Sequence, residues 1–173
     1  MSPVPRPVPT TLIVVSDRAA AGTRPDATAG LLAPVLEARG FRLAATVVVP
    51  DERPRLAQAI RDAAAAGGLV LTTGGTGVAP RDVTPEATRD VIEREVPGLP
   101  EEIRRRSAEK TLKALGSRAV AGTLGRALVL NLPGRPAGAV EAFEFVADVL
   151  GHLVDLLAGP VADASHEPTP PRA

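Results

Sequence analysis

Residues 69–86 read LVLTTGGTGVAPRDVTPE, in which an apolar run stops, a Gly-rich turn follows and a dense polar cluster comes next. With the preceding glycine, the run Gly68–Thr73 is apolar on both faces, which is typical of a central parallel strand. The glycines at 74, 75 and 77 tolerate positive φ and let backbone N–H groups approach an anion closely. We therefore expect a buried strand that ends in a loop suited to phosphate groups.

The segments around this stretch alternate between strand and helix patterns. Such alternation favours a three-layer α/β/α sandwich with a mostly parallel central sheet. We expect disorder in the Pro-rich residues 1–10, a single domain over 11–160 and a disordered tail over 161–173. The expected strands are 11–17, 41–52, 68–73 and two short ones around Leu124-Gly125, and the expected helices are 28–40, 53–68, 85–95, 101–116 and 136–159.

Polar or turn residues stand at the carboxyl ends of four expected strands. The four clusters are Ser16-Asp17, Asp51-Glu52, Thr73 to Gly77, and Asn131 to Gly134. If the strands are parallel, these clusters share one rim of the sheet. Ligands of open α/β sheets bind outside the carboxyl ends of the strands, so this convergence predicts a ligand site.

Composition excludes several kinds of site. The chain has no Cys and only two His, which leaves no thiol nucleophile, no Cys-based zinc site and little material for a Ser-His-Asp triad. Its net charge of +0 and its 2% aromatic content argue against a nucleic-acid partner. No run is long enough for a membrane span, and residues 1–10 lack the apolar stretch of a signal peptide, so we expect a cytoplasmic protein without a membrane partner. The chemistry must come from carboxylates, hydroxyls, Arg and backbone amides.

The acidic residues near the glycines are open to two interpretations. Thr84 and Pro85 form a good helix start, with Thr84 as N-cap and Pro85 at the first helical position. Asp82, which precedes that start, either caps the turn locally or binds a metal. At the next strand end, either Asp51 or its neighbour is a plain helix cap, or Asp51 is a second metal ligand. Two such carboxylates held close together suit Mg²⁺, which takes one or two carboxylates plus phosphate oxygens of a substrate. That ion would orient a nucleotide for in-line displacement without an enzyme nucleophile.

Other polar residues of the rim keep alternatives too. Asp17 accepts hydrogen bonds from a bound base or ribose, or pairs with Arg18. Ser107 stands on an Arg-rich helix whose default is a solvated face, and Ser117-Arg118 precedes a strand where it is able to contact phosphate. We assign nucleotide contacts to Ser16, Asp17 and Glu86. We assign substrate contacts to the loop and to the last strand end, at Thr73, Gly74, Gly75, Thr76, Gly77, Pro133 and Gly134.

Five motifs together resemble the MogA/MoaB family, which includes the G domain of gephyrin and of plant Cnx proteins. They are SDR at 16–18, PDE at 50–52, TTGGTG with RDVTPE at 72–77 and 81–86, SRAVAG at 117–122, and LNLPG at 130–134. The resemblance covers about Thr11 to Pro160, and its longest motif is highly specific. The compact segment after LNLPG is similar to MoaB-like members.

The resemblance implies a molybdopterin adenylyltransferase that uses ATP and Mg²⁺. Asp51 and Asp82 match the family's two essential acidic positions, and Gly74 to Gly77 match its substrate-cradling loop. Ser107, Ser117 and Asn131 match positions associated with molybdopterin binding. The resemblance also implies a homotrimer that passes its product to a MoeA-like molybdenum insertase.

Two other functions remain alternatives at this point. One is a MoaB-like protein that binds molybdopterin without turnover, which the compact length favours. The other is a CinA-like enzyme that hydrolyses a nucleotide-derived substrate, although the chain lacks the additional domain of such proteins. The presence of both Asp51 and Asp82 favours an active adenylyltransferase.

Overall fold

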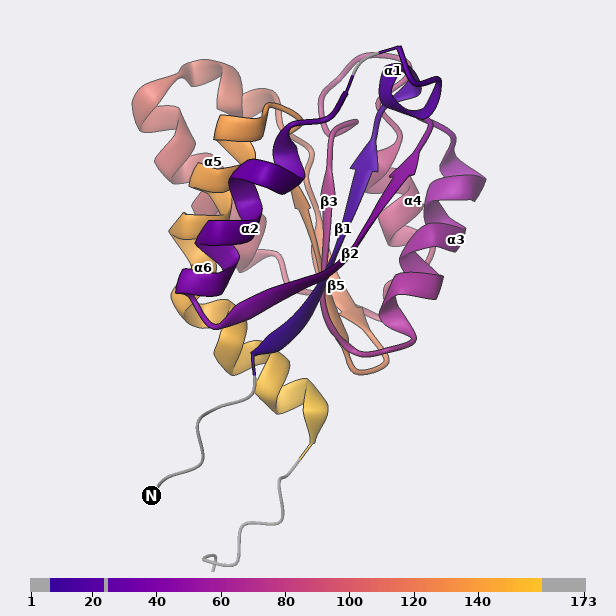
Figure 1. Ribbon diagram of the computed structural model, residues 1–173. Helices are drawn as coiled ribbons and strands as arrows, with labels where there is room; N and C mark the ends of the chain where they lie inside the picture. The colour runs from indigo at the N-terminus through magenta and orange to yellow at the C-terminus, as the bar shows by residue number, and fades with distance from the viewer. Residues whose placement is uncertain (1–6, 24, 160–173) are drawn as a thin grey trace, which may run out of the picture.

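The computed structural model describes residues 7–23 and 25–159, which form a three-layer α/β/α sandwich (Figure 1). The disorder predicted for 1–6 and 161–173 and the tail residue His166 lie outside the described residues. The elements are β1 (Val8–Val15), α1 (Asp17–Ala20), α2 (Thr28–Ala38), β2 (Phe41–Val49), α3 (Arg53–Ala64), β3 (Gly68–Thr73), α4 (Thr84–Arg89), β4 (Arg94–Glu95), α5 (Gly98–Lys110), a 3₁₀ turn η1 (Leu112–Gly116), β5 (Ala121–Leu124), β6 (Ala127–Leu132) and α6 (Pro136–Ala158).

The six strands follow the order β2-β1-β3-β6-β5-β4. β2, β1, β3 and β6 are mutually parallel, whereas β5 runs antiparallel to β6, and β4 pairs antiparallel with β5 at one edge. The chain leaves β1 for β2 on one side and returns to β3 on the other, so the point between β1 and β3 is a topological switch, where crevices form in α/β sheets. The predicted mostly parallel sandwich is confirmed.

Alternate side chains of the central strands supply two separate cores. Leu12 and Val14 of β1 pack with Leu36 of α2 and Phe143 of α6, on the face that α2, α5 and α6 cover (Figure 1). The intervening residues of β1 point to the opposite face and pack with Leu56 of α3. This period of two is why the central strands read as continuous apolar runs. No helix in the described part of the chain is long and apolar enough to cross a membrane.

Several predicted boundaries were wrong. The strand β1 begins at Val8, so residues 8–10 are not disordered, and the backbone of Val8 bonds that of Gly40. The helix expected over 85–95 ends at Arg89, because the following backbone pairs with the free edge of β5 and forms β4. The helix expected over 101–116 is α5 followed by the separate turn η1.

Candidate functional site

The four polar clusters meet at one rim, as the sequence predicts. Val15 of β1 is in register with Val49 of β2, and Val14 is in register with Thr73 of β3. Thr73 in turn is in register with Leu132 of β6. The residues that follow these strands therefore leave the sheet side by side, around the switch point between β1 and β3.

The Gly loop approaches its neighbours closely because it lacks side chains at two turning positions. Gly74 has φ 98°, and a Cβ there would lie 2.3 Å from the carbonyl oxygen of Val15. Gly75 has φ 62°, in the same left-handed region. Gly134, which follows β6, lies so near that its own Cβ would stand 3.1 Å from Cα of Gly74. The glycines thus bring the ends of β1, β3 and β6 together.

Asp51 and Asp17 are joined by reciprocal hydrogen bonds. The backbone N–H of Asp17 donates to Oδ2 of Asp51 at 2.9 Å, and the N–H of Asp51 donates to Oδ1 of Asp17 at 3.0 Å. This leaves Oδ1 of Asp51 directed at the Gly loop, where a Cβ on Gly75 would lie 3.3 Å from it. Burial raises the pKa of Asp51 above its ordinary value. Of the two residues offered as helix cap, the neighbour Glu52 is the N-cap of α3, and Asp51 is not.

Asp82 reaches the other end of the same loop. Its Oδ2 accepts the N–H of Ala79 at 2.9 Å, and it lies 2.8 Å from where a Cβ on Gly77 would be. Asp82 therefore caps the turn locally, and its carboxylate also lies beside the Gly loop. Its negative charge also acts on the pKa of Asp51, in the raising direction. The carboxylates of Asp51 and Asp82 thus border the same Gly loop.

This donor set fits a magnesium ion that is shared with a substrate. Within residues 7–23 and 25–159 there is no group of three or more His, Cys, Asp or Glu side chains that could hold a metal. A cage made only of protein ligands is therefore missing from this part of the chain. Mg²⁺ commonly takes one or two carboxylates and completes its shell with phosphate oxygens and water. Asp51 and Asp82, beside a loop whose residues 74, 75 and 77 are glycines, meet that requirement.

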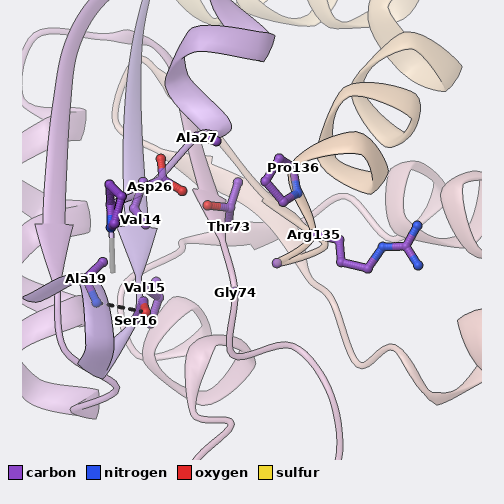
Figure 2. A pocket seen from close by; sticks show the side chains of 12 residues that line it. Val14, Val15, Ser16, Ala19, Asp26, Ala27, Thr73, Gly74, Arg135 and Pro136 are labelled. Atoms are coloured by element: carbon purple, nitrogen blue, oxygen red, sulfur yellow. Dashed lines mark hydrogen bonds between the residues drawn. The ribbon is translucent and has the colours of Figure 1, made fainter. Parts of the chain in front are cut away.

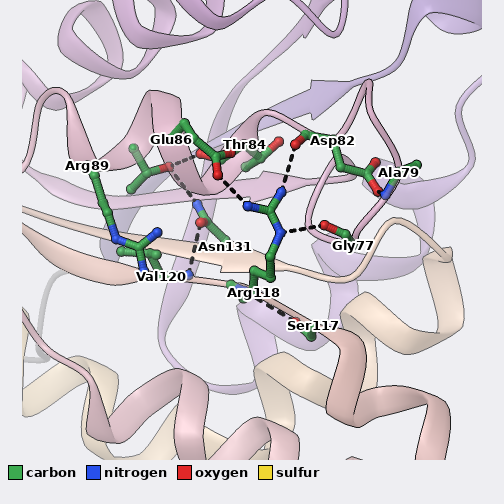
Figure 3. A network of polar contacts seen from close by, with 12 residues as sticks. Gly77, Ala79, Asp82, Thr84, Glu86, Arg89, Ser117, Arg118, Val120 and Asn131 are labelled. Atoms are coloured by element: carbon green, nitrogen blue, oxygen red, sulfur yellow. Dashed lines mark hydrogen bonds and ion pairs between the residues drawn. The ribbon is translucent and has the colours of Figure 1, made fainter.

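Arg118 fastens the loop, a role that the sequence analysis did not assign to it. Its Nε donates to the carbonyl of Gly77 at 2.7 Å and its Nη2 to that of Asp82 at 2.8 Å (Figure 3). Its backbone N–H donates to the carbonyl of Thr76 at 2.8 Å, and its Nη1 pairs with Glu86. In the sequence, this residue is the arginine of the SRAVAG motif, whose position before a strand predicts only a contact to phosphate.

Glu86, expected to contact nucleotide, is the carboxylate partner of Arg118 in this structure. The hydrogen bond from Arg118 holds the pKa of Glu86 below its ordinary value. One oxygen, Oε2, is buried and has no hydrogen-bond partner among the described residues. Thr84, expected as the N-cap of α4, instead donates from Oγ1 to the carbonyl of Gly74 at 2.8 Å. Val83 is the N-cap, so both Glu86 and Thr84 tie the start of α4 to the loop.

We expect Glu86→Gln to lower the free energy of unfolding by about 1 kcal/mol at pH 7, a value discounted because a third of the side chain is exposed. Because the folded pKa is depressed, the ion pair contributes fully above the ordinary Glu pKa of 4.5 and is lost as pH falls through the folded pKa. The difference from wild type should therefore shrink below pH 4.5. Urea unfolding at several pH values measures it, with Glu95→Gln as the control; a pH-independent difference contradicts the assignment.

A cleft of ≈250 Å³ opens beside the loop, on the α2 and α6 side of the sheet (Figure 2). Four predicted site residues line it: Ser16, Thr73, Gly74 and Gly134. Asp26 and Arg135 line it as well, and the sequence analysis did not name either. Ser16 caps α1 by accepting the N–H of Ala19 at 3.2 Å, and Asp26 accepts the N–H of Thr28 at 3.0 Å where α2 begins.

Comparison with known proteins decides the family. A family model described as a probable molybdopterin binding domain matches residues 11–152. The chain belongs to this molybdopterin-binding domain family.

Named relatives of the family are similar over most of their length. The molybdopterin adenylyltransferase of Haemophilus influenzae is 42% identical over 148 residues, which is 83% of this chain and 75% of the relative. That of Escherichia coli K12 is 37% identical over 179 residues, at 90% and 88% coverage. The crystal structure of the molybdopterin biosynthesis enzyme MoaB from Thermus thermophilus matches with a TM-score of 0.83 at 46% identity, covering 88% of this chain and 98% of that one.

The family resemblance implies substrate contacts for Ser107 and Ser117. The helix that carries Ser107 is hydrogen-bonded to the segment that carries Ser117. Ser107 is half-buried on α5, one turn after Arg104. Arg104 donates from Nη1 to the carbonyls of Ser117 and Ala119, at 3.4 and 3.2 Å. Ser117 follows η1 and leads into Arg118, so α5 is linked to the loop through this segment. Their contact with substrate stays a prediction.

Asn131 has a structural role in this member of the family. It is fully buried, its Oδ1 accepts the N–H of Val120 at 3.0 Å, and its Nδ2 donates to Oγ1 of Thr72 and of Thr88, each at 2.9 Å. The side chain thus ties β3, α4 and the start of β5 together behind the loop (Figure 3). Its side chain is fully buried in this structure, and a direct substrate contact by Asn131 stays a prediction.

We expect Asn131→Ala to lower the free energy of unfolding by about 2–3 kcal/mol, because it leaves buried hydroxyl and amide groups without partners. Chemical denaturation at pH 7 measures the loss. The control is Gln58→Ala, which removes an exposed amide that bonds Asp62 and should cost less than about 0.5 kcal/mol. Equal losses in the two variants would mean that the buried network contributes no more than a surface contact.

The remaining predicted contacts differ in exposure. Thr73 and Thr76 are nearly buried, at 2% and 9% exposed, whereas Gly75 and Gly77 are half-buried. Pro133 is half-buried beside Gly138 of α6. The glycines of the loop therefore present backbone, and the threonines present little side chain. Backbone amides are the loop's main means of binding an anion.

Proposed function

We propose that the protein catalyses Mg-ATP-dependent adenylylation of molybdopterin in molybdenum cofactor biosynthesis, giving adenylyl-molybdopterin and pyrophosphate. The observation that carries this proposal is the position of Asp51 and Asp82 at either end of one glycine loop, at the switch point of the sheet. Relatives that are 42% and 37% identical are named molybdopterin adenylyltransferases.

The proposed reaction needs no covalent enzyme intermediate. An oxygen of the terminal phosphate of molybdopterin attacks the α-phosphorus of ATP. A new P–O bond forms there, while the bond from the α-phosphorus to the oxygen bridging to the β-phosphate breaks and pyrophosphate leaves. Asp51 and Asp82 would hold Mg²⁺, which supplies charge neutralisation and orientation of the phosphates when bound. The N–H groups of Gly74 to Gly77 would bind the phosphate oxygens between the two substrates.

The two substrates would approach the loop from different sides. The cleft lined by Ser16, Thr73 and Arg135 suits the nucleotide, because it opens at the end of β1 beside Asp17 and Asp51. The segment from Ser107 to Ser117 suits molybdopterin, because Arg104 and Arg118 connect it to the opposite end of the loop. The chain holds three Phe and no other aromatic, so pterin recognition would depend on hydrogen bonds.

The test is an assay of the purified chain with molybdopterin, Mg²⁺ and ATP. Release of pyrophosphate together with adenylyl-molybdopterin supports the proposal. Tight molybdopterin binding without either product supports the silent MoaB-like alternative instead. That alternative is not favoured, because both acidic residues border the loop and the relatives named above carry the enzyme's name.

Three further properties are part of the proposal. The protein would be cytoplasmic and would hand its product to a MoeA-like molybdenum insertase. It would also form a homotrimer, for which exposed apolar side chains such as Leu31, Val47 and Val48 offer surface. Light scattering at micromolar concentration gives the oligomeric state; a monomer contradicts this part and leaves the reaction unaffected.

A further inference from the structure

Arg81 holds a position that the proposed reaction has not yet used. It ends the exposed segment 78–81, directly before Asp82. Its guanidinium crosses to the end of β1, where Nε and Nη2 lie 3.0 and 2.6 Å from Oδ2 of Asp17. The ion pair therefore joins the segment that follows the Gly loop to Asp17, which is hydrogen-bonded to Asp51.

Arg81 supplies positive charge to a cluster of carboxylates. Asp17 and Asp51 share reciprocal backbone-to-carboxylate hydrogen bonds. A positive charge paired with Asp17 therefore also stabilises the negative charge of Asp51. At Asp51, burial is the main influence and raises its pKa; the charges of Asp17 and Asp82 act in the same direction, and that of Arg81 opposes them. In this conformation the guanidinium provides part of the charge balance that a divalent cation would provide with substrate.

We propose that Arg81 is an exchangeable counterion: it pairs with Asp17 and offsets part of the negative charge of Asp17 and Asp51 before substrate binds, and it moves to the polyphosphate of ATP once a divalent cation is held at Asp51 and Asp82. The inference rests on the metal–nucleotide site of the proposed function. It makes Arg81 a substrate-positioning residue whose two partners are used in turn.

The exchange is feasible because the existing pair is weak and the new partner is strong. The side chains of Arg81 and Asp17 are 64% and 45% exposed, and ion pairs this exposed contribute little net free energy. A doubly charged cation near Asp51 repels the guanidinium, which weakens the pair further. Phosphate oxygens of ATP then offer the planar, bidentate acceptor geometry that arginine prefers.

The first test measures metal binding without nucleotide. Mn²⁺, which is detected by electron paramagnetic resonance, is titrated into wild type and Arg81→Ala. We expect Arg81→Ala to bind Mn²⁺ about fivefold more tightly, the factor for removing one unit charge roughly 8 Å from a doubly charged ion in water. Arg39→Ala is the matched control, because it breaks an exposed Arg–Asp pair with Asp148 and stands just before β2, at the opposite end of the sheet from the loop, and it should leave Mn²⁺ affinity unchanged.

The second test measures ATP binding by calorimetry in saturating Mg²⁺, without molybdopterin. We expect Arg81→Ala to bind ATP about tenfold more weakly, because it loses a charge-assisted contact to phosphate. Opposite changes in the two affinities are the signature of counterion exchange, since a purely structural loss would weaken both. Thermal unfolding of Arg81→Ala should match that of the Arg39→Ala control.

Two results overturn the inference. One is an equal Mn²⁺ affinity of wild type and Arg81→Ala, which includes the case in which neither protein binds Mn²⁺. The other is weaker binding of both Mn²⁺ and ATP, which assigns Arg81 to loop structure. Neither measurement requires adenylyl transfer. If the opposite shifts appear but molybdopterin is never adenylylated, the counterion role stands and the proposed function fails.

Discussion

We expect Asp51→Asn to lower the kcat of molybdopterin adenylylation by about 10³-fold, because a metal ion that neutralises phosphate charge contributes several kcal/mol to the transition state. The amide oxygen of Asn must keep accepting the N–H of Asp17, so its NH2 group would face the loop, and the charge that would attract Mg²⁺ is lost. Asp82→Asn should cost about as much, and the double variant little more than either alone, since both would serve one ion. Pyrophosphate release with saturating molybdopterin and ATP measures these rates.

The control for these variants is Asp148→Asn. Asp148 lies on α6, is 93% exposed and pairs with Arg39, far from the loop in sequence, so its variant should keep wild-type kcat. Circular dichroism should show the same fold in every variant. Turnover by Asp51→Asn within about tenfold of wild type refutes a metal-binding role for this residue, and so does full additivity of the Asp51 and Asp82 losses.

The largest expected change in stability is for Gly74→Ala, about 3–4 kcal/mol. Part of the loss comes from placing an L-residue at φ 98°, which costs about 1–2 kcal/mol. The rest comes from a Cβ at 2.3 Å from the carbonyl of Val15, because a carbonyl within the sheet has little room to move away. Chemical denaturation measures the loss, and turnover should fall with it because the loop is displaced.

Two other glycines separate these causes. Gly22→Ala has a comparable φ of 70° but nothing within 4 Å of the new Cβ, so it should cost about 1–2 kcal/mol. Gly68→Ala meets the carbonyl of Pro9 at 2.3 Å, at the opposite end of β3 from the loop, so it should lose stability while the soluble fraction keeps the wild-type KM for ATP. A loss in Gly74→Ala no greater than in Gly22→Ala would mean that the close approach to Val15 carries no strain.

The sheet was predictable because its apolar runs and its parallel register follow from local patterns. Gly68–Thr73 reads as a buried strand, and the four parallel strands then bring their ends to one rim. The short β4 was not predictable, because Arg94 and Glu95 are paired through the edge of β5 and not through any periodicity of their own. The division between α5 and η1 lies at Thr111, whose backbone is extended and whose hydroxyl accepts the N–H of Lys113.

The acidic pair and the glycines of the site were found from sequence, but their partners were not. Asp17 was expected to contact ligand or Arg18, whereas it pairs with Arg81, a residue 64 positions away. Arg118 and Asn131 were read as ligand contacts, yet both direct their hydrogen bonds to other parts of the protein. A polar residue at a strand end looks the same in sequence whether it faces a ligand or a neighbouring element, and only packing distinguishes the two.

The dependence of the loop on Arg118 has a consequence for how the protein matures. The contact to Gly77 joins residues 41 positions apart, and the same arginine also holds Thr76 and Asp82. During synthesis, the loop and both aspartates leave the ribosome well before the arginine that fixes their position. The nascent chain therefore carries both aspartates while the arginine that fixes the loop is still missing. The loop reaches its folded geometry only after the segment of Arg118 and the β5–β6 hairpin have folded onto the sheet.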